Sequence, residues 1–136
     1  SFKQELLVGT HNFTATTGDT FKIALYTSSA TLGAGTTAFT TSNEITNTSG
    51  TAYTSGGATL TSVTPTTDST TAVCDFADVS FTSASFTANG ALIYNDTQSD
   101  KAVAVIAFGG DKTVSSGTFT IQFPTADATN AIIRLA

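Results

Sequence analysis

The sequence predicts an all-β fold: a single-domain, jelly-roll-like β-sandwich of about eight strands, preceded by a short N-terminal helical arm. Three observations predict it. Apolar residues recur at every second position in several short segments, and turn sequences separate these segments at intervals of about 8–12 residues. Thr is the commonest residue, whereas charged residues make up only 11% of the chain. The 136 residues suffice for one domain with its own core, and we assign residues 1–136 to it.

The one helical pattern lies at the start of the chain, and we assign residues 1–9 to an arm. Phe2, Leu6 and Leu7 follow a helical spacing, and Gly9 is suited to end the segment. A helix of this length is unstable by itself. We therefore expect it to dock on the body of the domain or on a neighbouring molecule.

Strands with one buried face are predicted where apolar and polar residues alternate. The alternation is clearest in 21–26 and in 119–123, and further strands are expected at 59–64, 71–76 and 79–82. Residues of one strand face lie on the same side of a sheet. We therefore expect one face of the strand 119–123 to pack in the core against residues of other strands. The residues are Phe119, Ile121 and Phe123 on this strand and Phe21, Ile23, Leu25 and Phe76 on the others.

Three apolar runs complete the expected strands, at 91–94, 102–108 and 131–135. The last two lack alternation, so we expect both of their faces to be covered, by the second sheet or by another subunit. The residues predicted to form interfaces come from these two runs and from the arm: Phe2, Leu6, Leu7, Val103, Val105, Ile132 and Ile133.

Turn sequences separate the runs. Asn89-Gly90 predicts a tight hairpin, because both central positions of a type I′ turn need positive φ. Other corners are expected at Gly56-Gly57, at Gly109-Gly110-Asp111 and at Ser115-Ser116-Gly117. Pro124 is expected to end the strand before it, since proline has no N–H for a ladder.

The charge pattern excludes nucleic acid as a partner. The net charge is −5, the isoelectric point is near 4.3, and the five basic residues are spread along the chain rather than clustered. No apolar stretch is long enough to cross a membrane, and the first residues do not resemble a signal peptide. We expect a soluble protein that is made in a cytoplasm. Cys74, the single cysteine, is expected to lie in the core.

No pattern of catalytic residues emerges, so we expect a protein that is not an enzyme and binds no cofactor. His11 is the only histidine, the Gly-x-Ser-x-Gly turn of serine hydrolases is absent, and we interpret His11 as a hydrogen-bonded structural residue. Residues 33–38 superficially match a dinucleotide-binding motif, but no helical sequence follows to meet a pyrophosphate. We interpret this segment as a flexible loop.

The acidic residues do not form a recognisable metal site. Asp96 and Asp100 flank a polar loop, but their spacing matches no calcium-binding loop, and we expect solvated turn residues and no metal. Paired carboxylates for glycoside cleavage remain open, although the chain has no Trp to form a sugar platform. Asn-x-Ser/Thr triplets at Asn12, Asn47 and Asn95 are what chance yields in a Thr-rich chain.

Several strand and turn segments resemble a family of small virion structural proteins of tailed bacteriophages, nearly from end to end. None of these segments is a chemical motif, so the resemblance concerns fold and origin rather than a site. They are 9–13 (GTHNF), 19–27 (DTFKIALYT), 53–57 (YTSGG), 75–79 (DFADV), 90–95 (GALIYN), 117–121 (GTFTI) and 131–134 (AIIR).

The resemblance implies a capsid decoration or cement protein, located in a virion assembled in the host cytoplasm. Its partners would be the major capsid protein or other virion proteins, and a homo-oligomer, with a trimer as the first guess, is expected because capsid lattices offer three-fold sites. Placement in the tail, neck or fibre is the alternative. Two further alternatives are a module that binds host glycans and a secreted adhesin.

Overall fold

The structure of the chain, a computed structural model, describes residues 1–46 and 52–136; the Asn47 triplet lies outside these residues. In the described residues all strand pairs are antiparallel, and they form a four-stranded sheet of order β2-β1-β5-β6 and a three-stranded sheet of order β3-β4-β7. The predicted all-β class is confirmed. In chain order the elements are α1 (Phe2–Leu7), β1 (Phe21–Tyr26), β2 (Ala58–Thr59), β3 (Ser62–Asp68), β4 (Thr71–Phe76), β5 (Val79–Asn95), β6 (Lys101–Ile121) and β7 (Ile133–Leu135).

The described residues form seven strands rather than eight. Strand β5 joins the expected strands 79–82 and 91–94, and β6 joins 102–108 and 119–123. The expected strand 59–64 instead divides into β2 and β3. The six-residue α1 is short, and no described helix has the length and apolar character of a membrane-crossing segment.

The prediction of a hairpin at Asn89-Gly90 is wrong. Both residues lie within β5, and neither has a positive φ. Gly90 pairs with Tyr26 on one side and with Ala107 on the other. A Cβ on Gly90 would lie 2.7 Å from the carbonyl oxygen of Ile106. Glycine is needed here because a neighbouring backbone passes close by, not because the chain turns.

The chain reverses instead at residues 96–100. Asn95, the last residue of β5, pairs with Lys101, the first residue of β6. Ser99 and Asp100 have φ values of 56° and 59°, and this left-handed conformation closes the loop. The polar loop that the sequence indicated between Asp96 and Asp100 is therefore the hairpin connection.

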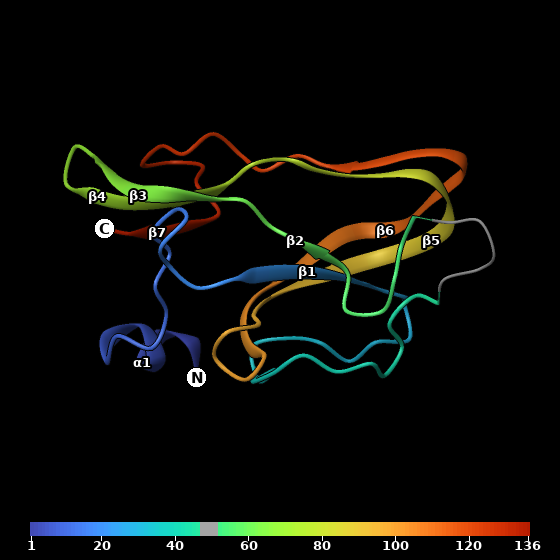
Figure 1. The fold of residues 1–136 in the computed structure, drawn as a ribbon, viewed down its shortest axis with the longest axis horizontal. Helices are drawn as coiled ribbons and strands as arrows, with labels where there is room; N and C mark the ends of the chain where they lie inside the picture. Colours follow the sequence, from blue (N-terminus) through green and yellow to red (C-terminus); the bar gives the residue numbers. More distant parts are fainter. Residues whose placement is uncertain (47–51) are drawn as a thin grey trace.

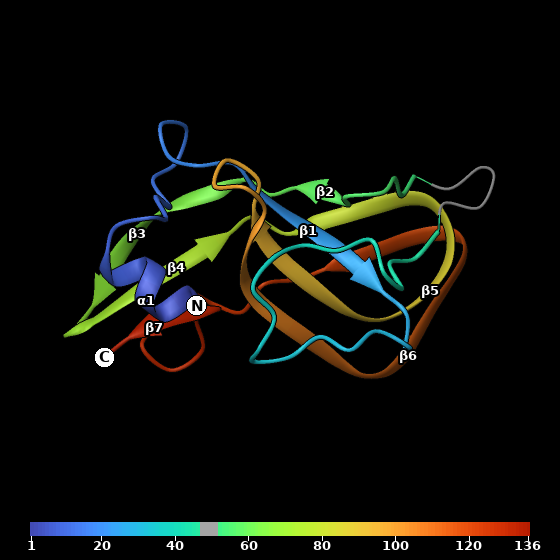
Figure 2. The ribbon, with the colours of Figure 1, turned by 90° about the horizontal axis from the view of Figure 1, so that it is seen from below.

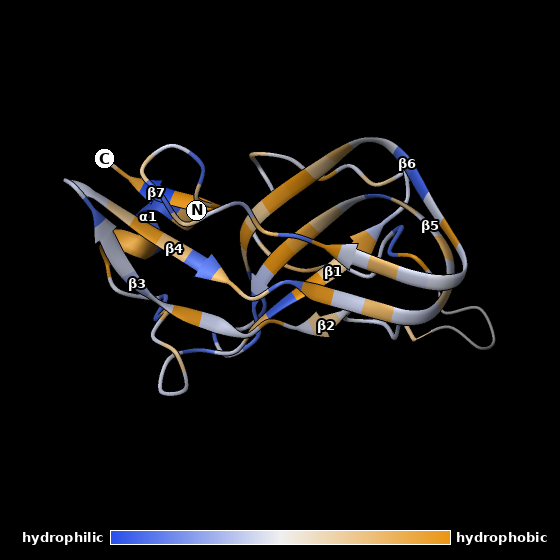
Figure 3. Ribbon diagram, turned by 90° about the horizontal axis from the view of Figure 1, so that it is seen from above, coloured by the Kyte–Doolittle hydropathy of each residue, from blue (hydrophilic) through white to orange (hydrophobic). Residues whose placement is uncertain are grey.

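The long ribbon of β5 and β6 bends back on itself. At the bend, residues 108–111 of β6 face the single residue Asn89 of β5, and Gly109 and Gly110 have φ values of 74° and 143°. Figure 1 shows the two strands running along the upper side of the molecule, turning at its right-hand end and returning beneath. Figure 3 shows hydrophilic colour on β6 near this bend. The predicted corner at 109–111 is therefore a bend in a continuous ribbon.

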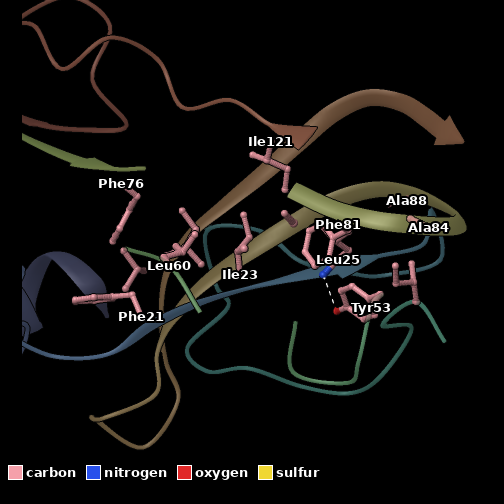
Figure 4. Packing of buried hydrophobic residues seen from close by; sticks show 14 of the residues in the cluster. Phe21, Ile23, Leu25, Tyr53, Leu60, Phe76, Phe81, Ala84, Ala88 and Ile121 are labelled. Atoms are coloured by element: carbon pink, nitrogen blue, oxygen red, sulfur yellow. Dashed lines mark hydrogen bonds between the residues drawn. The ribbon is translucent and has the colours of Figure 1, made fainter. Parts of the chain in front are cut away.

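The main core lies between the two halves of the ribbon and extends to the smaller sheet (Figure 4). Phe119 and Phe123 are partly buried against it, and the rings of Phe76 and Phe123 are 5.6 Å apart. Burial therefore follows the predicted strand faces. The predicted core residues that are buried members of this cluster are Phe21, Ile23, Leu25, Phe76, Ile121 and Cys74.

Strand β1 is covered on both faces, which its alternating sequence did not predict. Ala24 and Tyr26 belong to a second buried cluster on the other face of the sheet. The loop that follows β1 covers this cluster, and the ring of Phe39 stacks on that of Tyr94 at 4.7 Å. The hydroxyl of Tyr26 donates to the carbonyl of Thr40 at 2.6 Å, which ties the loop down.

Replacing Ile121 should test the core. Ile121→Ala should lower the free energy of unfolding by about 2–5 kcal/mol, through lost transfer energy and a cavity. Thr120→Ala, on the exposed face, removes only a hydroxyl contact with Ser80 and should cost far less. Urea denaturation of both variants measures the difference, and equal losses would show that the strand faces are assigned wrongly.

Replacing Gly57 should destabilise the turn before β2. Gly57 has a φ of 76°, and a Cβ there would collide with the carbonyl of Ile23. Gly57→Ala should therefore cost more than about 2 kcal/mol, because both strain and collision act. Gly35→Ala is the matched control, since a Cβ at Gly35 meets nothing. Thermal unfolding that is unchanged in Gly57→Ala would contradict this turn conformation.

Candidate binding surfaces around the N-terminal helix

The C-terminal end of α1 positions the helix. The N–H of Gly9 donates to the carbonyl of Leu6 at 3.1 Å, and the N–H of Thr10 donates to that of Glu5 at 2.9 Å. With Gly9 at a φ of 75°, these two bonds form a Schellman motif. The predicted end of the helix at Gly9 is confirmed.

The helix docks through a face that includes a charged residue. Phe2 and Leu6 pack against the main core, and Glu5 between them is only 6% exposed. Residues three and four positions apart share a helix face, so Phe2, Glu5 and Leu6 point together. Leu7 lies off this face and is 87% exposed. In Figure 2, α1 lies in front of β4 and β7, and Leu6 lines a pocket with residues of both strands.

A buried polar network ties α1 to the body of the molecule. The Glu5 carboxylate accepts from His11 Nε2 and from Lys101 Nζ, each at 3.1 Å. The other ring nitrogen of His11 accepts from Asn95 Nδ2 at 3.0 Å, and the same amide donates to Asp19 at 2.8 Å. The network therefore joins the helix, the segment before β1, the end of β5 and the start of β6.

The hydrogen bonds of Asn95 indicate which ring nitrogen of His11 carries the proton. The Asn95 carbonyl oxygen accepts the N–H of Gln98 at 3.2 Å, so its NH₂ group faces His11 and Asp19. His11 Nδ1 is then an acceptor, and the ring proton lies on Nε2, from which it donates to Glu5. Both nitrogens of the buried ring are used, which confirms His11 as a hydrogen-bonded residue.

Two carboxyl groups of the network have lowered pKa values. Burial opposes ionisation of Glu5, but hydrogen bonds from His11 and Lys101 and the charge of Lys101 outweigh it and lower the pKa of Glu5 below 4.5. Burial likewise opposes ionisation of Asp19, but the backbone N–H of Asn12 and two side-chain amides lower its pKa below 3.8. The ionised forms of both groups therefore stabilise the folded state.

A second buried carboxylate holds the loop that precedes β2. Glu44 accepts from the hydroxyl of Tyr53 at 2.6 Å, from that of Ser55 at 2.8 Å and from the N–H of Gly56 at 2.6 Å. The Tyr53 hydroxyl in turn accepts the N–H of Leu25 at 3.0 Å (Figure 4). Burial raises the pKa of Tyr53. Glu44 is thus a structural residue that fixes this loop against β1.

The structure brings three of the predicted interface residues together at one groove. Phe2, Val103 and Val105 line a groove with a volume of about 560 Å³ beside the N-terminal end of α1. Val103 is buried, whereas Val105 is 38% exposed. Within this chain, the run 102–108 is therefore covered on both faces only as far as about Val105. Coverage of the remainder by another subunit, the other expected possibility, stays a prediction.

Two other predicted interface residues meet at a smaller apolar pocket. Leu6 and Ile133 line it together with Leu135, which is 55% exposed. Ile132 is partly buried against the main core, and Leu7 lines neither the groove nor this pocket. The seven predicted residues thus divide among the groove, the pocket, the partly buried Ile132 and the exposed Leu7.

The remaining sequence candidates have ordinary contacts. In the Gly-rich segment, the N–H of Thr36 donates to the carbonyl of Gly33. No helix follows, because Ala38 forms a β-bridge with Lys101. Asp96 lies 3.1 Å from Lys22 Nζ. Over residues 1–46 and 52–136, no group of three or more His, Cys, Asp or Glu side chains is arranged to hold a metal ion.

Sequence reasoning identified His11 but missed the rest of its network, which consists of Glu5, Asp19, Asn95 and Lys101. Asn95 follows directly on the apolar run 91–94, and it is fully buried. A polar residue that continues a buried strand is the signal that would have indicated a buried hydrogen bond. This burial also leaves the Asn95 triplet inaccessible to modification.

No protein-family model, curated protein or solved structure matches the chain.

The network around Glu5 should make stability depend on pH in the acidic range. Because the pKa values of Glu5 and Asp19 are lowered in the folded state, their ionised forms stabilise the fold above pH 4.5 and pH 3.8, respectively. This stabilisation is lost as the pH falls through the folded-state pKa values. Glu5→Gln should lower the urea midpoint at neutral pH and lose less stability between about pH 5 and pH 2.

Asp100→Asn is the control, because it removes one carboxylate for which no side-chain hydrogen bond is found in the described part of the chain. It should leave the acid dependence close to that of the parent protein. An acid profile of Glu5→Gln that is parallel to the parent profile would contradict a stabilising ionised Glu5.

Proposed function

We propose that the chain is a non-enzymatic structural protein of a bacteriophage virion, which binds the outer surface of the capsid as a homo-oligomer and stabilises the head. The observation that carries this proposal is aliphatic surface at the end of the molecule formed by α1 and β7 (Figure 1). Leu7, Val8 and Leu135 are 87%, 65% and 55% exposed there. Contiguous exposed apolar surface marks contacts with other proteins, and we infer that these three side chains contribute to one such surface.

The state of the reactive side chains supports a non-enzymatic role. Both ring nitrogens of His11 are used in buried hydrogen bonds. Burial raises the pKa of the Cys74 thiol to about 12, so it is not a nucleophile near neutral pH. The single histidine and the single cysteine are therefore engaged in the structure rather than available for a substrate.

The outer surface of the ribbon suits a crowded assembly. Pairs of hydroxyl groups face each other across β5 and β6, Ser80 with Thr120 and Thr87 with Thr113, each at 2.8 Å. Uncharged polar surface stays soluble, and few charges let many copies lie close together with little repulsion. We also infer that the two layers form a jelly-roll-like β-sandwich. The resemblance of the sequence segments to virion proteins supports the class of partner.

The docking of α1 changes how its role is tested. Phe2 and Leu6 belong to the packing of the core, and Glu5 is an anchor. Deleting residues 1–8 would therefore unfold part of the body rather than remove a free arm. A single substitution at Leu7, which is exposed, separates binding from folding.

Leu7→Asp should leave the fold intact and abolish binding to the particle. A surface substitution changes the free energy of unfolding by about 0.5 kcal/mol or less, whereas a charge in an apolar contact blocks association. Thr82→Asp, at an exposed position of β5, is the control with the same new charge. Occupancy is measured by electron microscopy of particles that lack the protein, after each variant is added back.

Density on heads for the parent protein and Thr82→Asp, but not for Leu7→Asp, is the expected result. Density confined to tails, necks or fibres would contradict the capsid placement and leave a structural role. Full head occupancy by Leu7→Asp would contradict this contact surface.

A further inference from the structure

The groove beside α1 exposes the edge of a strand. Residues 102–105 of β6 line it consecutively. Successive side chains of a strand point to opposite faces of the sheet. A groove that touches four consecutive residues therefore meets the strand along its backbone edge, not on one face.

This edge is paired only at its start. β6 is an outer strand of the four-stranded sheet. Ala38 forms an antiparallel bridge with Lys101, and the N–H of Ala102 donates to the carbonyl of Thr37 at 3.0 Å. Beyond this point, within the described residues, 103–107 form backbone hydrogen bonds with β5 alone. The edge thus accepts one antiparallel segment and is then open, which makes it a template for a further strand.

The walls of the groove indicate what fits. Among the lining residues, Gly33, Ala34 and Ala104 are small, and Val105 offers apolar surface. Lys3 is the charged side chain of the described lining, and no carboxylate lines the groove with it. No ion pair to Lys3 is found in the described part of the chain. The complementary ligand is an extended segment of small and branched apolar residues with a carboxylate near Lys3.

The residues that flank this edge favour a single extended segment over a folded sheet as the occupant of the groove. Residues 1–3 and Gly33, Ala34 and Thr36 line the groove together with the strand. A second folded copy would have to bring a whole sheet against these walls, whereas a single extended segment enters between them. Main-chain hydrogen bonds then provide affinity, and side-chain contacts provide specificity.

We propose that the 102–105 edge of β6 binds an extended, acid-containing segment of a partner protein, which adds to the sheet as an antiparallel strand. This inference goes beyond the proposed function and uses a surface other than Leu7. It therefore holds or fails independently of where the protein lies in a virion.

The test uses a capped eight-residue peptide that alternates valine and threonine around one central glutamate. Addition of the peptide up to about 1 mM should shift the backbone amide NMR signals of residues 102–106. The same peptide N-methylated at alternate residues cannot donate ladder hydrogen bonds, and it should bind about tenfold more weakly or not at all.

Charge reversal tests the role of Lys3. Lys3→Glu should weaken binding of the glutamate peptide by about fivefold, and a peptide with lysine in place of glutamate should restore it. Lys112→Glu, an exposed lysine near the bend of β6, makes the same change of charge and should leave binding unaltered. The amide spectrum of each variant without peptide reports its fold.

Three results would overturn the proposal. The first is an absence of shifts at residues 102–106 with the parent protein. The second is equal binding of the N-methylated peptide, which would mean that the groove recognises side chains without forming a strand. The third is self-association of the parent protein through this edge in sedimentation experiments, which would make a second copy the occupant.

Discussion

The bend in the β5–β6 ribbon is the constraint on which the rest of the structure depends. A flat ribbon of two strands could not bury the apolar residues on its inner face. Because residues 108–111 face the single residue Asn89, the ribbon folds back, and its two halves enclose one core. Phe81 on the outgoing half and Ile93 on the returning half thereby join the same cluster. The position of β1, which pairs with the returning half of β5, follows from this closure.

Hydrogen bonds to buried polar groups stabilise the segments that lie outside the sheets, namely α1 and the loop before β2. Glu5 and Glu44 are both buried. Glu5 accepts hydrogen bonds from two side chains outside the helix, and Glu44 accepts three from residues 53, 55 and 56. Burying a carboxylate is costly unless it is paired and hydrogen-bonded. In the described residues, no buried side-chain nitrogen or oxygen lacks a partner. The helix and the loop before β2 are thus held by specific contacts, although neither could be stable alone.

The two surfaces proposed for binding, the one at Leu7 and the groove along residues 102–105, lie close to the network around Glu5. The polar network around Glu5 sets the position of α1, which places Leu7 in solvent and Phe2 at the wall of the groove. The same network includes Lys101, the residue at which the outer edge of β6 begins its short bridge to Ala38. Changes to the network are therefore expected to affect both surfaces, whereas a substitution at the exposed Leu7 or Lys3 changes one surface alone.

The sequence by itself determined the all-β class, the short helix that Gly9 closes and the burial of Ile121, because alternation and turn residues act over a few positions. Only the tertiary structure decided that Gly90 lies inside a strand, since its role depends on the backbone of Ile106, which is remote in sequence. The same holds for Leu7 and for the network around Glu5. Whether a side chain is buried or exposed depends on which distant segment packs against it. The local sequence does not determine which segment that is.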